Sequence, residues 1–259
     1  MEENKMKKLL KKVLCLSLVA IIALFAVGCG SNSSKDENDG GNSSSKLSTD
    51  NTTDDVVDIS KYGYTDNPDG KTLTIHSNGI SESEEKAKIL DIPSEIDGKT
   101  VTEIEENGFY FCKNIEEVII PNTVEKIGGN AFLGDEKLKK ITLSESVKEI
   151  GEMCFGENTS LTEINLPSSL KVISVAAFYC TSLEKITIPE GVERIEATSF
   201  SYCEKLKEIH IPSSVTFIQG ESEEASSAFM ESPNVTIYAP KGSYAEKYAK
   251  QENIKFVAE

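Results

Sequence analysis

Six stretches of this chain repeat one pattern: an aliphatic segment that ends in proline, then V-x-x-I, then a small residue and phenylalanine. The five regular copies start at an almost constant interval of roughly 22–23 residues, a period that is typical of a solenoid with one stacked coil per repeat. The copies begin at Ala87, Ile115, Leu138, Leu161, Leu183 and Leu206. The sequence therefore predicts about six coils, each one repeat long, and an extended surface rather than an enclosed catalytic pocket.

Within one coil, the spacing of the apolar residues predicts which side chains face inward. In the copy that starts at Leu138, Ile141 and Leu143 are two residues apart and belong on the inner side of a strand. The V-x-x-I supplies a second apolar edge, and Phe155 plugs the turn. One coil cannot enclose these side chains, so neighbouring coils must stack with their strands about 4.8 Å apart. We therefore expect a repeat solenoid with a parallel β-sheet on one face.

Sequences outside the repeats predict a cap at each end. Before the first copy, residues 62–65 and 72–76 flank a Pro-Asp-Gly turn, which is the pattern of a β-hairpin. After the last copy, one more strand pattern leads into a helix, where Ser243 and Glu246 fit a capping box. A short strand follows at 254–257. We thus expect an N-terminal hairpin cap and a C-terminal helix and strand cap, because an open coil would expose apolar side chains.

The N-terminus carries the features of an export signal. Several lysines precede an apolar run at 13–27, which at about fifteen residues is short for a membrane-spanning helix of about twenty. The run leads into Ala26-Val27-Gly28-Cys29, which resembles a bacterial lipobox, in which the cysteine receives a lipid and becomes the new N-terminus. An uncleaved N-terminal anchor is the alternative. Both interpretations place the rest of the chain outside the cytoplasm and attached to a membrane.

These features divide the chain into three parts. Residues 1–28 are predicted to be a lipoprotein signal peptide. Residues 29–58, rich in Ser, Asn, Gly and Asp, are predicted to be a disordered tether. Residues 59–259 are predicted to form the folded domain, which consists of the repeats and a cap at each end. Its N-terminal cap, coils and C-terminal cap are expected at about 59–86, 87–234 and 235–259.

Charge limits the partners that this chain can bind. Without residues 1–28, 22 basic and 41 acidic residues remain, which gives a net charge of −19. Nucleic acids and anionic lipid surfaces both require clustered Lys and Arg, and Arg194 is the single arginine. We therefore expect no nucleic-acid partner, and we expect the lipid on Cys29 to make the contact with the membrane. The acidity favours cationic partners.

Short motifs in the copies resemble the BspA-like (Treponema pallidum-type) leucine-rich repeat family of bacterial surface proteins. They are the I-x-I-P strand ending at 186–189, the V-x-x-I, the Ala-Phe and the C-x-x-L at 180–183, with Ser144 replacing the proline in one copy. The resemblance implies a right-handed leucine-rich repeat solenoid at the bacterial cell surface. It also implies a role in adhesion or ligand binding. We expect a monomer that is held on the outer side of the cell membrane.

The cysteines and histidines form no catalytic or metal-binding motif. Counted back from the next copy, Cys112, Cys180 and Cys203 share a position at which a small residue caps backbone groups of a turn. A disulfide between Cys180 and Cys203 on adjacent coils is the alternative. No CxxC pair supplies zinc ligands, and His76 and His210 lie in no metal or triad motif. We therefore expect neither a cofactor nor enzymatic activity.

The outward strand positions are the best candidate for a binding surface. They are expected to form one continuous sheet face that takes no part in the core. Acidic and basic residues alternate along this face from coil to coil, which also helps to fix the register of the coils. The face comprises Glu117, Ile119, Lys140, Thr142, Glu163, Asn165, Lys185, Thr187, Glu208 and His210.

A second candidate patch is aromatic. Tyr179 and Tyr202 are predicted to take matching turn positions on adjacent coils, with Phe111 farther along the solenoid. Adjacent exposed aromatic rings suit a glycan or a protein hot spot, although such rings also cover turns. The sequence thus predicts a lipid-anchored surface protein that binds an extracellular protein or glycan. A structural scaffold of the cell envelope without a dedicated ligand is the alternative.

Overall fold

The computed structural model describes residues 55–58, 62–78, 86–220 and 226–259, all within one compact unit that spans Asn51–Glu259. The predicted signal peptide, Cys29 and nearly all of the predicted tether lie outside the described residues. The same holds for 221–225, which is inserted in the last copy. In the part of the chain that is described, no helix has the length and apolar character needed to cross a bilayer.

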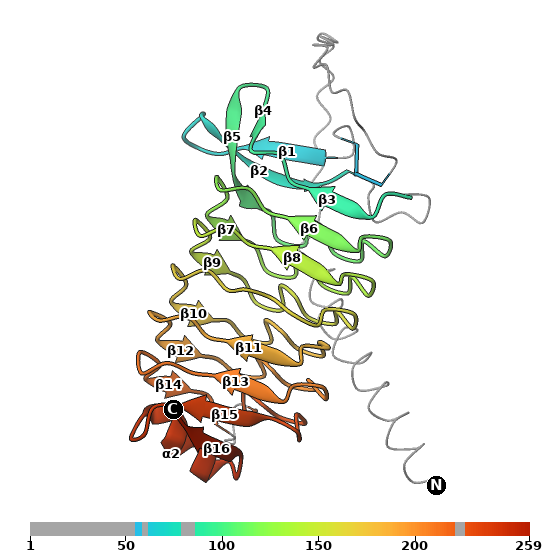
Figure 1. The fold of residues 1–259 in the computed structure, drawn as a ribbon. Coiled ribbons are helices and arrows are strands. Elements are labelled where there is room, and N and C mark those ends of the chain that lie inside the picture. Colours follow the sequence, from blue (N-terminus) through green and yellow to red (C-terminus); the bar gives the residue numbers. More distant parts are fainter. Residues whose placement is uncertain (1–54, 59–61, 79–85, 221–225) are drawn as a thin grey trace, which may run out of the picture. The chain divides into compact units, whose positions relative to one another are not determined.

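The six copies form six coils that stack in the order of the sequence (Figure 1). In every coil except the one that starts at Leu161, the first strand joins one of two parallel ladders, which we together call the front sheet, and the outward side of this sheet is the front face. Its strands are β3 (Ile89–Asp91), β6 (Glu117–Ile119), β8 (Lys140–Thr142), β11 (Lys185–Thr187), β13 (Glu208–His210), β15 (Thr236–Ala239) and β16 (Lys255–Ala258). Neighbours pair in the register that the repeat predicts, with Lys185 opposite Glu208. The predicted solenoid with a parallel sheet is confirmed.

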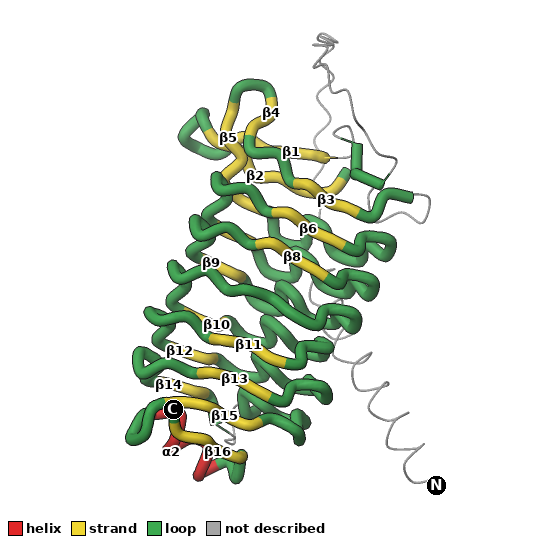
Figure 2. Tube along the Cα trace, viewed as in Figure 1, coloured by secondary structure: helices red, strands yellow, loops and turns green. Residues whose placement is uncertain are grey.

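The V-x-x-I segments form further parallel ladders, in two parts that we together call the back sheet. The sequence predicts only an apolar edge here, so the structure adds a second sheet to the predicted one. The last two residues of this motif are extended, and their backbone groups pair with the next coil while the isoleucine points inward, as Ile127 and Ile150 do. Figure 2 shows strands in both positions with turns between them. The back sheet comprises β2 (Thr72–Ser77), β5 (Lys99–Ile104), β7 (Lys126–Ile127), β9 (Glu149–Ile150), β10 (Val172–Ile173), β12 (Arg194–Ile195) and β14 (Phe217–Ile218).

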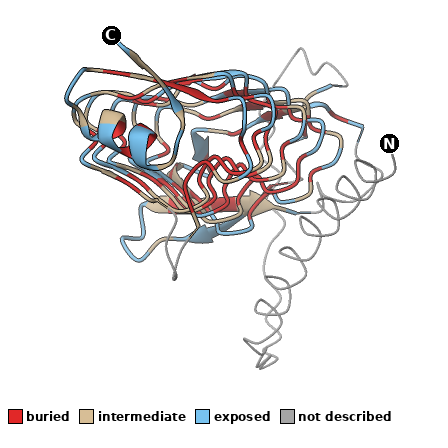
Figure 3. Ribbon diagram, turned by 90° about the horizontal axis from the view of Figure 1, so that it is seen from below, coloured by how far each residue is buried: buried red, intermediate tan, exposed pale blue. Residues whose placement is uncertain are grey.

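The phenylalanine of each coil fills the turn, as predicted. The rings are buried and lie nearly parallel in one column, with neighbouring centroids 5.4 to 5.8 Å apart. We call this column the phenylalanine stack. It consists of Phe109, Phe132, Phe155, Phe178, Phe200 and Phe229. Figure 3 shows the buried residues along the inner side of the coils and the exposed residues outside them.

A tyrosine from each cap closes the phenylalanine stack. The ring of Tyr62 meets Phe109 edge-on with centroids 6.1 Å apart, and Tyr248 meets Phe229 at 6.0 Å. The hydroxyl of Tyr62 donates to the backbone oxygen of Asp91 at 2.8 Å. Burial raises the pKa of both tyrosines, which keeps the hydroxyls protonated.

The N-terminal cap is the predicted hairpin. β1 (Tyr62–Asp66) pairs antiparallel with β2, and β2 pairs in parallel with β5 of the first coil. Asp69 holds the turn because its carboxylate accepts the backbone N–H groups of Lys71 and Thr72 at 2.8 and 2.9 Å. The insertion in the first copy makes a second small hairpin, in which β4 (Glu95–Ile96) pairs with β5.

Residues 55–58 belong to the folded unit, so the predicted end of the tether at residue 58 is too late. Val56 forms a parallel bridge with Ile89, and Val57 is buried. The backbone N–H of Val57 donates to the oxygen of Ile89 at 2.9 Å. Two adjacent valines supply the apolar area that the preceding polar sequence lacks.

The C-terminal cap combines the predicted helix and strand. In α2 (Tyr244–Gln251), the Ser243 hydroxyl accepts the backbone N–H of Glu246 at 3.3 Å. The Glu246 carboxylate accepts the N–H of Gly242 at 2.6 Å, one residue earlier than in a standard capping box. β16 begins one residue later than predicted and pairs in parallel with β15. It thereby covers the edge of the front sheet.

Candidate interaction surfaces

Ion pairs join neighbouring coils across the front face. The Lys140 ammonium lies 2.6 Å from the Glu117 carboxylate, and Lys185 lies 3.1 Å from Glu208. The preceding column is paired in the same way by Lys139 with Glu116 at 2.6 Å and by Lys207 with Glu184 at 3.1 Å. Each pair is exposed and contributes at most about 1 kcal/mol, so these pairs mainly fix the register.

A cavity of about 330 Å³ opens on the first coils of the front face. Three lysines and three acidic residues line it, so it carries little net charge. The hydrogen bond from Lys139 holds the pKa of Glu116 below its usual value. Two residues of the predicted binding face, Glu117 and Lys140, contribute to this cavity. The lining comprises Asp55, Lys88, Ile89, Glu116, Glu117, Lys139 and Lys140.

His210 ends the predicted face and is held on two sides by the C-terminal cap. Its ring stacks on Tyr238 with centroids 4.8 Å apart, and its Nδ1 lies 3.0 Å from Glu259. The sequence could not predict these contacts, because Glu259 is far away along the chain and lies beyond the last strand. His210 is therefore a packed residue at the edge of the face.

The front face is interrupted, so the expectation of one continuous sheet face is wrong. The copy that starts at Leu161 forms no strand in the front sheet, and Glu163 and Asn165 lie in an irregular segment between β8 and β11 (Figure 2). This copy reads Ile-Asn-Leu-Pro where the next reads Ile-Thr-Ile-Pro. Asn and Leu are less favourable in strands than Thr and Ile, which accounts for the missing strand.

The predicted aromatic patch contains one buried ring. Tyr179 is only 3% exposed, and the half-buried Tyr202 packs against it edge-on with centroids 5.4 Å apart. The two tyrosines do not take matching positions. Cys180 matches Tyr202, since both have positive φ and both donate their backbone N–H to the next coil. The copy that starts at Leu161 is one residue shorter than its neighbours, and the missing residue follows Phe178. Positions that are counted back from the start of the next copy are therefore assigned one residue too early in this coil.

The exposed aromatic ring on the turn side is Tyr110, which sequence reasoning missed. It is 46% exposed and packs edge-on against the half-buried Phe111 with centroids 5.5 Å apart. Tyr110 and Tyr179 both follow the phenylalanine of their coil, but their neighbours differ. The ring of Tyr202 covers Tyr179, whereas the equivalent position beside Tyr110 is Gly134, which has no side chain.

The described cysteines form no disulfide. The sequence analysis placed Cys180 in one column with Cys112 and Cys203, but in the structure Thr181 takes this position. We call this column the capping column, and three of its side chains bond the backbone oxygen of the phenylalanine one coil earlier. Asn158 donates to Phe132 at 3.0 Å. Cys203 and Ser232 do the same to Phe178 and Phe200, at 3.1 and 2.6 Å. The predicted capping role is thus confirmed for this column, although its membership is corrected at one coil.

Asp135 is the one carboxyl group in the capping column, and it is fully buried. One of its oxygens accepts the backbone N–H of Cys112 at 2.6 Å. The other has no hydrogen-bond partner among the described residues. Burial raises the pKa of Asp135 well above its usual value, because the charged form loses its hydration.

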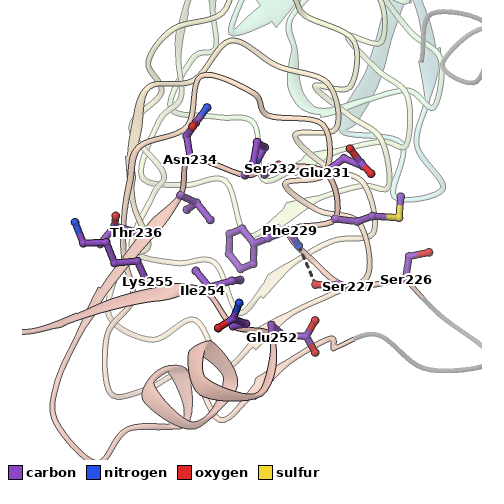
Figure 4. Close-up of a pocket in the computed structure, with 14 residues that line it drawn as sticks. Ser226, Ser227, Phe229, Glu231, Ser232, Asn234, Thr236, Glu252, Ile254 and Lys255 are labelled. Atoms are coloured by element: carbon purple, nitrogen blue, oxygen red, sulfur yellow. Dashed lines mark hydrogen bonds between the residues drawn. The ribbon is translucent and has the colours of Figure 1, made fainter. Parts of the chain in front are cut away.

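A pocket of about 940 Å³ lies at the C-terminal end, between residues 226–236 of the last coil and residues 252–255 of the cap. Figure 4 shows the Phe229 ring on one side and Ile254 with Glu252 on the other. Among the described residues, no group of three His, Cys, Asp or Glu side chains could hold a metal ion here or elsewhere.

Known proteins support the fold. A family model described as the BspA type leucine-rich repeat region matches residues 102–236 in six copies, just over half of the chain. Among curated proteins, none matches.

Several solved structures are similar to this chain. A leucine-rich repeat protein from Bacteroides ovatus has 28% identity and a TM-score of 0.60, over 70% of this chain and 46% of that one. A leucine rich cell surface protein from Faecalibacterium prausnitzii has 28% identity and a TM-score of 0.53, over 71% and 54%. The T. pallidum leucine-rich repeat protein, at 24% identity and a TM-score of 0.58 over 78% and 97%, shows the fold alone. The present chain spans less than half of the B. ovatus protein.

These findings identify a bacterial leucine-rich repeat protein with a protein-interaction fold. The family is typically a non-catalytic binding scaffold. The six matched copies span most of the stacked coils, and the chain belongs to the BspA-type leucine-rich repeat family.

Proposed function

We propose that this chain is a lipid-anchored protein of the bacterial cell surface that binds an extracellular protein or glycan through its front face, without catalysis. The observation that carries the proposal is the front face itself. Its outward side chains take no part in the core, and two of them, Glu117 and Lys140, help to line a cavity of about 330 Å³. The export signal with Cys29 supports the location. The likeness to a leucine rich cell surface protein from F. prausnitzii supports it as well.

A structural scaffold of the cell envelope is the second candidate, and the ion pairs favour it. Lys140 and Lys185 are both engaged by carboxylates of neighbouring coils. A face whose charges neutralise one another serves stacking and solubility without any ligand.

Reversing two charges of the front face distinguishes the two candidates. Lys140→Glu combined with Lys185→Glu should change the affinity for a bound partner at least about tenfold, because it replaces two positive charges of the interface with negative ones. The free energy of unfolding should fall by less than about 2 kcal/mol, since both lost ion pairs are exposed. Binding is measured against immobilised extracellular-matrix proteins, mucins and envelope glycans.

The matched control is Lys126→Glu combined with Lys148→Glu. These lysines pair across coils on the back sheet, with Glu103 at 3.7 Å and Glu125 at 2.7 Å. An equal change of binding in both double variants would contradict a site on the front face. Loss in Tyr110→Ala alone would place the site on the turns. A screen in which nothing binds the wild type would support the scaffold.

The lipid anchor has its own test. Cys29→Ala should abolish incorporation of a clickable fatty acid and release the protein from the membrane pellet, because no other residue is placed to accept the lipid at the end of the signal. Cys15→Ala, within the predicted signal peptide, is the control and should leave labelling intact. Wild-type protein that carries no label would show that the anchor is wrong.

A further inference from the structure

One junction between coils differs from all the others. Neither the front nor the back sheet pairs strands between the coil that starts at Leu138 and the coil that starts at Leu161. Every other pair of neighbouring described coils shares at least one of the two ladders. Figure 1 shows no arrow between β8 and β11, where the other front strands follow one another. We call this place the split junction.

The split junction is held on its turn side. Backbone N–H groups of Phe155 and Glu157 donate to the following coil at 2.9 and 2.7 Å. Away from the turn, serine side chains replace the ladder. The hydroxyl of Ser174 donates to the oxygen of Ile150 at 2.5 Å, and Ser168 donates to Glu145 at 2.8 Å. The two coils are therefore attached by backbone hydrogen bonds at the turn and by serine side chains elsewhere, without a shared ladder.

The core is most accessible at the split junction. Ile141 and Ile164 are 5% and 7% exposed, whereas the equivalent residues of the other four coils are at most 2% exposed. Leu143 and Leu166 are half-buried, whereas their equivalents are at most 3% exposed. Solvent therefore reaches these four side chains more than it reaches their equivalents in the other coils. We use the name notch for Leu143, Glu163, Asn165 and Leu166, which lie on the two sides of the split junction.

The notch is encoded in the sequence. The last inward residue of the strand is isoleucine in four copies and leucine in the two copies that flank the split junction. Leucine lacks the branch at Cβ that favours a pleated strand. Asn165 adds a residue that is depleted in strands. The sequence alone marks these departures, although only the structure shows that both ladders end there.

Glu163 gives the notch its charge. It is exposed and forms no ion pair with any described residue. The two lysines on either side of it in the same column are turned away, because Lys140 pairs with Glu117 and Lys185 pairs with Glu208. Thus the copy that lacks a front strand carries an exposed carboxylate without an ion pair to any described residue, and the half-buried Leu166 is in the same copy.

We propose that the notch receives an arginine or lysine side chain from an extended segment of a protein partner. The aliphatic stem of such a residue would pack on Leu143 and Leu166. Its cationic head would pair with Glu163 and hydrogen-bond the carbonyl oxygens that the missing ladder leaves open. The net charge of −19 outside residues 1–28 would attract such a segment over longer distance. This inference rests on the proposed function, because it names the partner's chemistry at the front face.

The probe is a short fluorescein-labelled peptide in which arginine and serine alternate, and its control has citrulline in place of arginine. Fluorescence anisotropy should show binding of the arginine peptide alone. Glu163→Gln should weaken this binding about fivefold or more. The matched control, Glu208→Gln, removes an acidic residue that already pairs with Lys185 and should change binding less than about twofold.

A second variant tests the notch without removing the charge. Asn165→Thr combined with Leu166→Ile gives this copy the Ile-Thr-Ile-Pro sequence of the next. We expect the ladder to close, the melting temperature to rise, and the peptide to bind as weakly as it does to Glu163→Gln. Unchanged binding despite a higher melting temperature would overturn the notch as the site.

Two further outcomes would also overturn the inference. Equal weakening by Glu163→Gln and Glu208→Gln would mean general attraction to an acidic surface. A wild-type protein that does not bind the arginine peptide would mean that the notch takes no such side chain. Neither outcome touches the proposed function, which is judged by the Lys140 and Lys185 double variant on a partner found in the screen.

Discussion

Replacing Phe155 or Phe178 with alanine should lower the free energy of unfolding by about 3–5 kcal/mol. Both rings are buried and stack on each other with centroids 5.7 Å apart. Each also stacks on a ring of the coil beyond, at 5.8 and 5.4 Å. Removal therefore leaves a void between two rings that the rigid coils cannot close. Urea denaturation followed by circular dichroism measures the loss.

Phe111→Ala is the control for the phenylalanine stack. Phe111 is half-buried and lies outside the stack, so its loss should cost clearly less than that of a stacked ring. A loss of less than about 1 kcal/mol at both Phe155 and Phe178 would contradict the stacked packing.

Asp135→Asn should raise the free energy of unfolding at neutral pH by about 1–3 kcal/mol, because it removes a buried carboxyl oxygen that lacks a partner. The next coil shows the compatible arrangement, in which Asn158 donates to the oxygen of Phe132 at 3.0 Å. An asparagine at 135 could make the same bond to Phe109 while still accepting the N–H of Cys112.

The gain from Asp135→Asn should depend on pH. The ordinary pKa of this carboxyl is 3.8, and burial raises its pKa in the folded state. The protonated carboxyl of Asp135 therefore makes its full contribution to stability below pH about 4. This contribution is lost as the pH rises through the raised pKa of the folded state. The stability difference between variant and wild type should grow with pH in denaturation series at several pH values. Asp91→Asn, at an exposed carboxylate, is the control. A difference that stays constant with pH would show that Asp135 is not protonated in the fold.

The fixed period made the coils and the phenylalanine stack predictable. Because Phe155 and Phe178 stand one repeat apart, the same contact recurs in every coil, and a register error would have disrupted all of them. Departures from the period were harder to interpret. One residue is missing between Phe178 and Leu183, and the predicted positions of Tyr179 and Cys180 were therefore wrong by one residue. The sequence does not show at which point between Phe178 and Leu183 the residue is missing. The back sheet was missed because two extended residues per coil give too short a pattern to indicate a strand.

The candidate site was predictable in part for the same reason. Lateral neighbours in a parallel ladder follow from the period, so the pairing of Lys140 with Glu117 was expected. The absence of an ion pair between Glu163 and the rest of the described chain was not expected. It depends on which of two neighbouring carboxylates each lysine pairs with, and on the break in both ladders. Local residues weaken the strand, but the loss of pairing is decided by the packing of two neighbouring coils together.

The tyrosines at the two ends of the phenylalanine stack determine where the run of stacked coils ends. A phenylalanine ring offers two equivalent apolar faces, so any coil can follow any other. Tyr62 and Tyr248 instead carry hydroxyls bonded to Asp91 and Ser227, at 2.8 and 2.7 Å, and they meet the stack edge-on or tilted. They act as terminators, whereas the coils between them are interchangeable units. A gene of this kind can gain or lose one whole copy of the repeat and still encode a chain that both ends can close.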